Sequence, residues 1–340
     1  MDVPGPTPRG YQRDIHDFGS GCLAIRPPGS RLAELGRSEL GRSELGRSEL
    51  ACETGPVDWT PGYRELPPPA WLRSALSCFW VGVTSPARCE RTLVLPDACT
   101  DLIWSRGEAA FLAGPDTGPA PVLQAAGSVL VGARFRPGAG GGILGLPLAE
   151  VANQRVDVAQ IPALRARMPR PDLPPRLVLP ALAALIAELV RDRPADIATT
   201  HAARLLSRPG SGAQEVADSM GLSERQLRRR CQAGVGYGPR TLQRILRFRR
   251  FVSAIDAGPP AGGLAAAAIA AGYADQSHLS RECAQLSGLT PRALAQVRRP
   301  GAERPRPSEA EPGTRGPAPA GSSVVRAGSR GFRRPCGSTG

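Results

Sequence analysis

The 340-residue sequence predicts an α+β protein, in which a β-rich N-terminal domain precedes an all-α domain and each end is a disordered tail. Three observations lead to this prediction. Short apolar runs separated by turn residues extend from Tyr63 to about Leu164, as in a compact β-rich domain. From Leu177 onward, apolar residues recur at helical spacing. The 40 Gly and 36 Pro crowd the two ends, where no apolar period supports a core.

These changes in composition and apolar spacing divide the chain into five predicted segments. The first contains Gly-Arg-Ser-Glu-Leu three times in tandem, at Gly36–Leu40, Gly41–Leu45 and Gly46–Leu50. A five-residue period spirals around a helix, so the repeats offer no apolar face to bury. The segments are a disordered leader (1–60), a β-rich domain (61–168), a helical connector (169–194), a helical domain (195–299) and a disordered basic tail (300–340).

Six apolar runs carry the predicted strands. Turn residues such as Ser85-Pro86 and Pro96-Asp97 separate them. The glycine cluster Gly138–Gly142 lacks the G-K-[ST] of a phosphate loop, so we expect a flexible turn after a strand. The runs are Ala75–Val83, Arg91–Leu95, Asp101–Trp104, Ala109–Ala113, Val122–Gln124 and Ser128–Phe135.

Helices are predicted after the break at Pro169–Pro175. Ala181–Val190 and Ala195–Leu206 have the apolar content and length of packed helices. The run Arg208-Pro209-Gly210-Ser211-Gly212 then separates them from the remaining helices.

The basic residues are all Arg, and they are unevenly placed. Residues 211–300 hold 13 Arg against 6 acidic residues, whereas residues 1–210 hold 23 against 21. A phosphate-binding surface requires such an excess, although a solvated Arg-rich face gives the same pattern. The total net charge is +13.

Cysteine and histidine usage bears on compartment and metal chemistry. The 8 Cys form no C-x-x-C pair, and the 3 His neighbour no Cys cluster, so we expect no metal and no cofactor. Met1–Gly10 lacks the apolar core of a signal peptide, and no apolar stretch is long enough to span a bilayer. The expected compartment is the reducing cytoplasm.

The stretch Ala213–Gly234 predicts two helices around a tight turn. Val216, Ala217 and Met220 form the inward face of a short helix, and Gly221 follows where positive φ is needed. Ser223 and Gln226 then match the capping box that begins a second helix. Burying Leu227 and Cys231 exposes Glu224, Arg225, Arg228, Arg229 and Gln232. This is the pattern of a helix-turn-helix, whose second helix enters the DNA major groove.

The same pattern returns 52 residues later. Leu264–Ala271 is an apolar helix, Gly272-Tyr273-Ala274 is a turn, and Asp275 caps a helix that buries Leu279, Cys283 and Leu286. That helix exposes Gln276, Ser277, His278 and Arg281. Between the units, Pro239–Ile255 predicts a rod of roughly 24 Å. It can hold two reading helices about one DNA turn, roughly 34 Å, apart.

Residues Gly210–Gln296 resemble the DNA-binding domain of the AraC family of regulators. By that resemblance, Arg225, Arg228 and Arg229 lie where the first reading helix meets DNA, and Gln276, Ser277 and Arg281 where the second does. The family usually carries a bulky aromatic at the positions of Cys231 and Cys283; we interpret both as buried, unreactive thiols. The matching text is GLSERQLRRR (221–230), VGYGPRTLQRILRFRR (235–250), AGYADQSHLSR (271–281) and GLTPRAL (288–294).

The chemistry of these residues fits DNA. Arg can bind guanine and Gln can bind adenine through two hydrogen bonds, although half to two-thirds of such contacts go to the backbone. Arg247, Arg249 and Arg250 on the rod are either solvated or bind phosphate, and Arg249 is our candidate phosphate contact. His278 is expected to face the groove or to take part in the cap.

The N-terminal half is similar, more loosely, to the sensor-like β domain of one branch of these regulators. The resemblance implies a signal-receiving or dimerising role. Asp97 and Asp101 are interpreted as turn and cap residues rather than catalytic ones. The matching text is YRELPPP (63–69), CFW (78–80), LPDACTDLIW (95–104) and GARFRPG (132–138).

We therefore predict a non-enzymatic, sequence-specific transcriptional regulator. Its expected partners are double-stranded DNA, a small-molecule effector, a second copy of the chain and RNA polymerase, with no membrane. Two alternatives stay open. One is a DNA-repair alkyl-acceptor enzyme, which needs a zinc-held Cys cluster; Cys78, Cys89 and Cys99 lack close spacing. The other is an architectural protein that binds DNA without sequence preference.

Overall fold

A computed structural model describes residues 57, 59–260 and 262–298. They form a β-rich half followed by a helical half, as the sequence predicts. The repeats of residues 36–50, the rest of the predicted leader up to residue 56, and the predicted tail lie outside the described residues. No helix in the described part is long and apolar enough to cross a membrane.

The β half is built on an antiparallel six-stranded sheet, with the strand order β1-β2-β7-β4-β5-β8. A separate antiparallel pair, β3 and β6, makes a two-stranded sheet. The strands are β1 (Gly62–Leu66), β2 (Leu76–Val83), β3 (Glu90–Val94), β4 (Thr100–Ser105), β5 (Phe111–Ala113), β6 (Ala120–Gln124), β7 (Val129–Phe135) and β8 (Arg155–Asp157).

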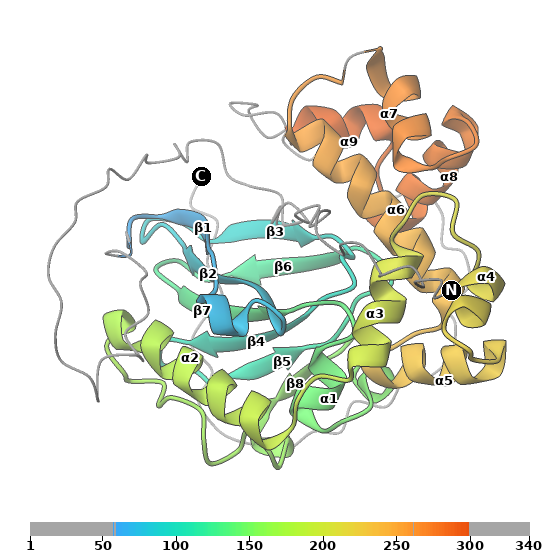
Figure 1. Ribbon diagram of the computed structural model, residues 1–340. Helices are drawn as coiled ribbons and strands as arrows, with labels where there is room; N and C mark the ends of the chain where they lie inside the picture. The colour runs from blue at the N-terminus through green and yellow to red at the C-terminus, as the bar shows by residue number, and fades with distance from the viewer. Residues whose placement is uncertain (1–56, 58, 261, 299–340) are drawn as a thin grey trace, which may run out of the picture.

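The two faces of the six-stranded sheet have different neighbours. Because side chains alternate along a strand, Phe79 and Val81 of β2 point to one face, while Cys78 and Trp80 point to the other. The first face packs against α2 (Pro175–Asp192), the helix drawn alongside the sheet in Figure 1. The indole of Trp104 on this face donates to the carbonyl of Arg170 over 2.9 Å. The other face lies toward β3 and β6, as the residues that line a cavity between them show.

Each of the six predicted runs overlaps a strand, but the strands β1 and β8 and the helix α1 of this half were not predicted. β1 and β8 lie at the edges of the sheet. The glycine cluster Gly138–Gly142, expected to be a flexible turn, instead leads into α1 (Gly140–Leu144). Gly140 and Gly141 are buried there, and the backbone of Ala233 passes too close to Gly141 for a side chain. The three single turns of 3-10 helix are η1 (Ala70–Leu72), η2 (Leu148–Glu150) and η3 (Val158–Gln160).

The helical half follows the predicted pattern closely. The break at Pro169–Pro175 ends where α2 begins, and Pro180 is accommodated within α2. The predicted rod Pro239–Ile255 is α6. Figure 1 shows α6 joining the part that holds α4 and α5 to the part that holds α7, α8 and α9. The helices are α3 (Ile197–Leu206), α4 (Ala213–Ser219), α5 (Glu224–Val235), α6 (Pro239–Asp256), α7 (Gly263–Ala271), α8 (Gln276–Ser287) and α9 (Pro291–Val297).

The core of the helical half extends into the β half. Leu95 and Ala98, from the loop between β3 and β4, are buried in the same cluster as residues of α3, α5 and α6. Leu93 of β3 packs against that cluster as well. The apolar core of the helical half therefore includes residues of the β half, from β3 and the loop at residues 95–99.

Candidate DNA-binding surface and a cavity in the β half

The first helix-turn-helix unit has the local geometry that its sequence predicts. Gly221 adopts φ 63° in the turn between α4 and α5, a conformation that most L-residues avoid. Ser223 caps α5, accepting from the Gln226 amide over 3.3 Å, and the Gln226 side chain accepts from the Ser223 amide over 2.8 Å. Leu227 and Cys231 are fully buried. This orientation leaves the side chains of Arg225, Arg228 and Arg229 exposed.

The second unit repeats this arrangement. The Asp275 side chain accepts from the His278 amide over 2.7 Å and begins α8. Leu279, Cys283 and Leu286 are buried, whereas Gln276, Ser277 and Arg281 are exposed at the N-terminal part of α8.

Glu282 fixes α8 against α6. This buried carboxylate accepts from Arg247 over 2.8 and 3.3 Å, and its Oε1 lies 3.3 Å from the His278 ring. The Arg247 guanidinium also lies 5.1 Å from the ring centre of Tyr273. His278 meets the edge of the same ring. The imidazole of His278 is thus held within the protein, half-buried, although its backbone belongs to the cap as expected.

Arg247, Arg249 and Arg250 of the rod do not form one solvated or phosphate-binding row. Arg247 pairs with Glu282, as described above. Arg250 donates to the carbonyls of Ala271 and Ser207, tying α6 to α7 and α3. Burial and Asp97 raise the pKa of the Cys99 thiol, and the positive charge of Arg249 partly opposes this shift, so Arg249 lies near the β half. Its predicted phosphate contact stays a prediction.

The two thiols at the aromatic positions of the family are buried. Cys231 and Cys283 have no exposed surface, and burial raises the pKa of the Cys231 thiol to about 12. Burial also raises the pKa of Cys283, which contacts the hydroxyl of Ser287. Thiols in this state are poor nucleophiles. Among the described residues, no group of three or more His, Cys, Asp or Glu is arranged to hold a metal ion.

A cavity of about 190 Å³ lies between the two sheets of the β half. Residues of all eight strands line it, so its wall is fixed by the sheet itself. Trp80 and Tyr63 form an aromatic wall, with ring centres 5.7 Å apart. The polar and charged residues of the lining are Thr92, Gln124, Glu90, Asp101, Arg134 and Arg155.

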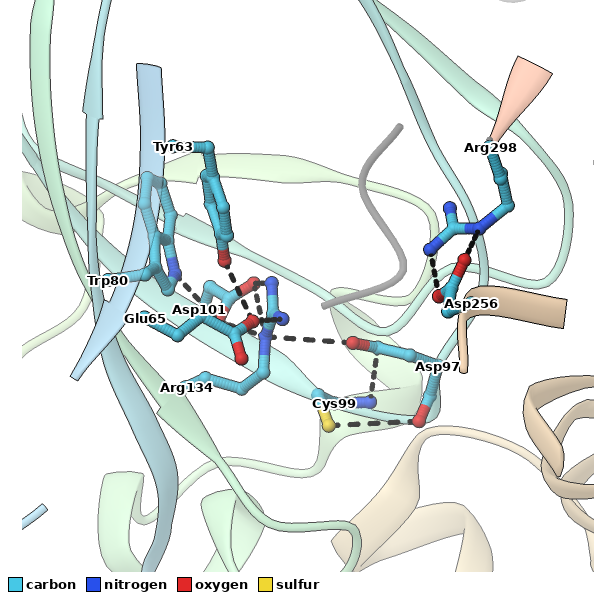
Figure 2. Close-up of polar contacts among 9 residues, drawn as sticks. All are labelled: Tyr63, Glu65, Trp80, Asp97, Cys99, Asp101, Arg134, Asp256 and Arg298. Carbon is cyan, nitrogen blue, oxygen red and sulfur yellow. Dashed lines mark hydrogen bonds and ion pairs between the residues drawn. The ribbon is translucent and has the colours of Figure 1, made fainter. Parts of the chain in front are cut away.

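Arg134 stands at the centre of a buried charge cluster (Figure 2). Its guanidinium donates to Asp101 through two nitrogens, each over 3.0 Å, and to Glu65 over 3.4 Å. Asp97 lies 3.6 Å away. The hydroxyl of Tyr63 donates to Glu65 over 3.1 Å, and the indole of Trp80 donates to Asp101 over 3.3 Å. Asp101 is therefore a strand residue in an ion pair, not a cap.

Asp97 belongs to both the charge cluster and the loop at residues 95–99. As expected of a turn residue, its carboxylate accepts from the Cys99 amide over 2.9 Å. Its neighbour Ala98 has φ 65°, which is uncommon for a residue with a side chain. Tyr237 lies in the connection between α5 and α6. Its buried hydroxyl has no hydrogen-bond partner among the described residues. Burial and the nearby Asp97 raise the pKa of Tyr237.

Sequence reasoning missed the cavity residues, although one signal was available. Arg134 is a lone charge inside the apolar strand VLVGARF, and Trp80 shares its face of the sheet. Gly132 leaves room for this indole, because a Cβ there would lie 2.1 Å from Trp80. A charged residue in a central strand indicates a buried partner, and the partners lie in the segments 63–69 and 95–104, which resemble the sensor-like β domain.

Comparisons with known proteins match two separate parts of the chain. A family described as "Helix-turn-helix domain" matches residues 216–296, and one described as "Domain of unknown function (DUF6597)" matches residues 64–157. A search of curated proteins found no match. The chain carries the DNA-binding part of a transcription regulator. Its helix-turn-helix region, residues 216–296, is a domain of the AraC type.

Similar solved structures include two of ToxT from Vibrio cholerae. For ToxT of strain O395 the identity is 11% and the TM-score 0.36, covering 64% of this chain and 97% of that one. For wild-type ToxT bound to an unsaturated fatty acid, from strain SCE256, the identity is 12% and the TM-score 0.36, covering 66% and 98%.

Proposed function

We propose that this protein is a sequence-specific transcription regulator that reads two successive major grooves with α5 and α8. The observation that carries the proposal is the repeated geometry: each helix is capped at its N-terminus, anchored by buried residues and exposes long polar side chains in its first turns. Helix-turn-helix proteins present base-reading residues in this position. α6 joins the two units as a continuous helix of 18 residues, roughly 27 Å long.

The proposed base contacts come from residues of two chemical types. Arg225, Arg228 and Arg229 on α5 and Arg281 on α8 can bind guanine O6 and N7, and Gln276 can bind adenine N6 and N7. Ser277 is a further polar contact on α8, whereas His278 contributes mainly by holding the helix start. Each good bidentate pair discriminates by about 1–3 kcal/mol against a wrong base.

A binding-site selection with single variants tests this proposal. We expect Gln276→Ala and Arg281→Ala to relax the preference at one or two base pairs in one half of the site. Arg228→Ala should act about ten base pairs away, because α6 fixes the spacing at one DNA turn. If Arg249 contacts phosphate, Arg249→Ala should weaken binding to all DNA sequences about equally. It should also reduce the slope of log affinity against log salt concentration by roughly one unit.

Arg176→Ala is the matched control, because Arg176 is an exposed arginine on α2. This substitution also removes one positive charge, but at a position that lies outside both reading helices. If every variant lowers affinity uniformly and no position loses its preference, the protein is an architectural DNA-binding protein instead.

We propose that the cavity of the β half is the effector site. Its walls are preformed by strands, and the charge cluster around Arg134 leads through Asp97 to the loop at residues 95–99. Because Leu95 and Ala98 pack among α3, α5 and α6, a displacement of this loop reaches the first reading unit directly. The homodimer, RNA polymerase and cytoplasmic location remain predictions.

A further inference from the structure

The walls of the cavity combine aromatic faces with carboxylates. The rings of Tyr63 and Trp80 stack at 5.7 Å with planes 30° apart, and Phe111 adds a third ring to the lining. Trp80 lies directly over the backbone at Gly132, so its indole is held in place. The carboxylates of Asp101 and Glu90 line the same space, from strands on the two opposite sheets. Aromatic faces carry partial negative charge and attract cations.

Neither arginine of the lining is available to an anionic ligand. Arg134 already binds Asp101 and Glu65, with Asp97 at 3.6 Å. Arg155 binds both oxygens of Asp116 over 2.7 and 3.0 Å. A carboxylate or phosphate entering the cavity would therefore compete with carboxylates that are already in place.

Among the described residues, the charges around the cavity sum to a negative value. Two guanidinium groups, Arg134 and Arg155, face the five carboxylates of Glu65, Glu90, Asp97, Asp101 and Asp116. Arg249 on α6 adds one positive charge near Cys99, behind Asp97, and this still leaves an excess of negative charge. Buried excess charge is unfavourable unless a proton or a counter-ion offsets it. Consistent with this, burial raises the pKa of Asp101, and nearby Asp97 adds to the shift.

We propose that the cavity binds a small organic ammonium ion, held between the aromatic wall and the carboxylate of Glu90 and favoured by the net negative charge of the cluster that contains Asp101. This inference rests on the proposed effector role of the β half and names the chemical class of the effector. The size of the cavity agrees with a small ligand, since 190 Å³ corresponds to the liquid volume of roughly six water molecules. Apolar groups of the ion would contact Ile103, Val122 and Leu130 of the lining.

Isothermal titration calorimetry of the full chain, without DNA, tests the ligand class. The probes are tetramethylammonium, choline, the neutral carbon analogue of choline, and tert-butylacetate as an anion of similar shape. We expect at least one of the two cations to bind about tenfold more tightly than the neutral analogue, a ratio equivalent to about 1.4 kcal/mol. Failure of both cations to bind, or equal or tighter binding of the neutral analogue or the anion, would overturn the inference.

Single variants locate the binding. Glu90→Gln should lower cation affinity several-fold and leave the neutral analogue unaffected, because only the charge changes at a half-buried position. Asp101→Asn should do the same, provided its circular dichroism spectrum matches that of the wild type. Asp172→Asn, an exposed acid outside the cavity, is the matched control. Equal cation affinity in Glu90→Gln and the wild type contradicts the proposed site.

A DNA-binding measurement separates this inference from the effector role. The full chain is titrated with its selected duplex in the presence and absence of the cation that binds. A change in DNA affinity supports the effector role. Calorimetric binding with unchanged DNA affinity supports the ligand class and overturns the effector role.

Discussion

At the scale of single residues, burial decides what each ionisable group can do. The thiol of Cys231 is enclosed by apolar neighbours, which makes the thiolate unfavourable and raises its pKa to about 12. In contrast, the buried side chains of Arg134 and Glu282 each have a partner of opposite charge at hydrogen-bond distance. The sequence correctly predicted that Cys231 and Cys283 are buried, since both lie on the apolar face of their helices. It could not reveal the cavity cluster, because Glu65, Asp101 and Arg134 meet only when the four strands β1, β2, β7 and β4 pair in that order.

The thiols provide a prediction at this scale. At pH 8, we expect Cys231 and Cys283 of the native protein to resist alkylation by iodoacetamide, because a raised pKa leaves almost no thiolate at that pH. Half-buried Cys89 should react first among the cysteines of the described part. Peptide mass spectrometry resolves the three sites, and the same reaction in denaturant confirms that each can be alkylated. Rapid labelling of Cys231 in folded protein would contradict its burial.

At the scale of elements, predictability follows how local the stabilising contacts are. The starts of α5 and α8 were predictable because the caps at Ser223 and Asp275 lie within three residues of the groups they bind. β1 and β8 were not predictable: β1 carries adjacent charges, and β8 has three residues, so pairing with neighbours defines both. The helix α1 begins with three glycines, which disfavour helix formation on their own. Its stability comes from packing against the rest of the fold.

The close approach of α1 to α5 yields a prediction for Gly141. A Cβ at this position would lie 2.6 Å from the carbonyl oxygen of Ala233, so the backbone of one helix must shift. We expect Gly141→Ala to lower the free energy of unfolding by about 1–3 kcal/mol, as overpacking usually does. Gly118→Ala is the control, because nothing lies within 4 Å of its added Cβ. Urea unfolding followed by circular dichroism measures both, and equal stability of the two variants would exclude the contact.

At the scale of the whole molecule, the two halves pack against each other through the loop at residues 95–99. Leu95 and Ala98 belong to the helical core, and Asp97 between them belongs to the charge cluster beside the cavity. Tyr237 and Gly236, from the helical half, also lie at the interface between the two halves, and Tyr237 is buried there. A Cβ on Gly236 would lie 3.1 Å from the carbonyl oxygen of Leu148 in the β half. The sequence predicted both halves and the helices between them, but not this contact, since it joins residues more than a hundred positions apart.

The shared core predicts one cooperative unfolding transition. We expect differential scanning calorimetry of the full chain to show a single peak, and Leu95→Ala to lower its midpoint, because the substitution leaves a cavity among α3, α5 and α6 at a typical cost of about 2–5 kcal/mol. Residues 195–299 alone should still bind duplex DNA at low salt, but should melt at a lower temperature than the full chain. Two separate peaks, of which only one responds to Leu95→Ala, would show that the halves unfold independently.

The loop at residues 95–99 also limits how this protein could be recombined with its relatives. Although residues 216–296 match a widely reused kind of domain, part of their apolar core is encoded more than a hundred residues upstream, at Leu93, Leu95 and Ala98. A chimera joined near residue 195 would inherit the reading helices without the residues that complete their packing. Exchange of the helical half at full stability therefore requires transferring residues 93–99 with it, and the transferable unit is discontinuous along the gene.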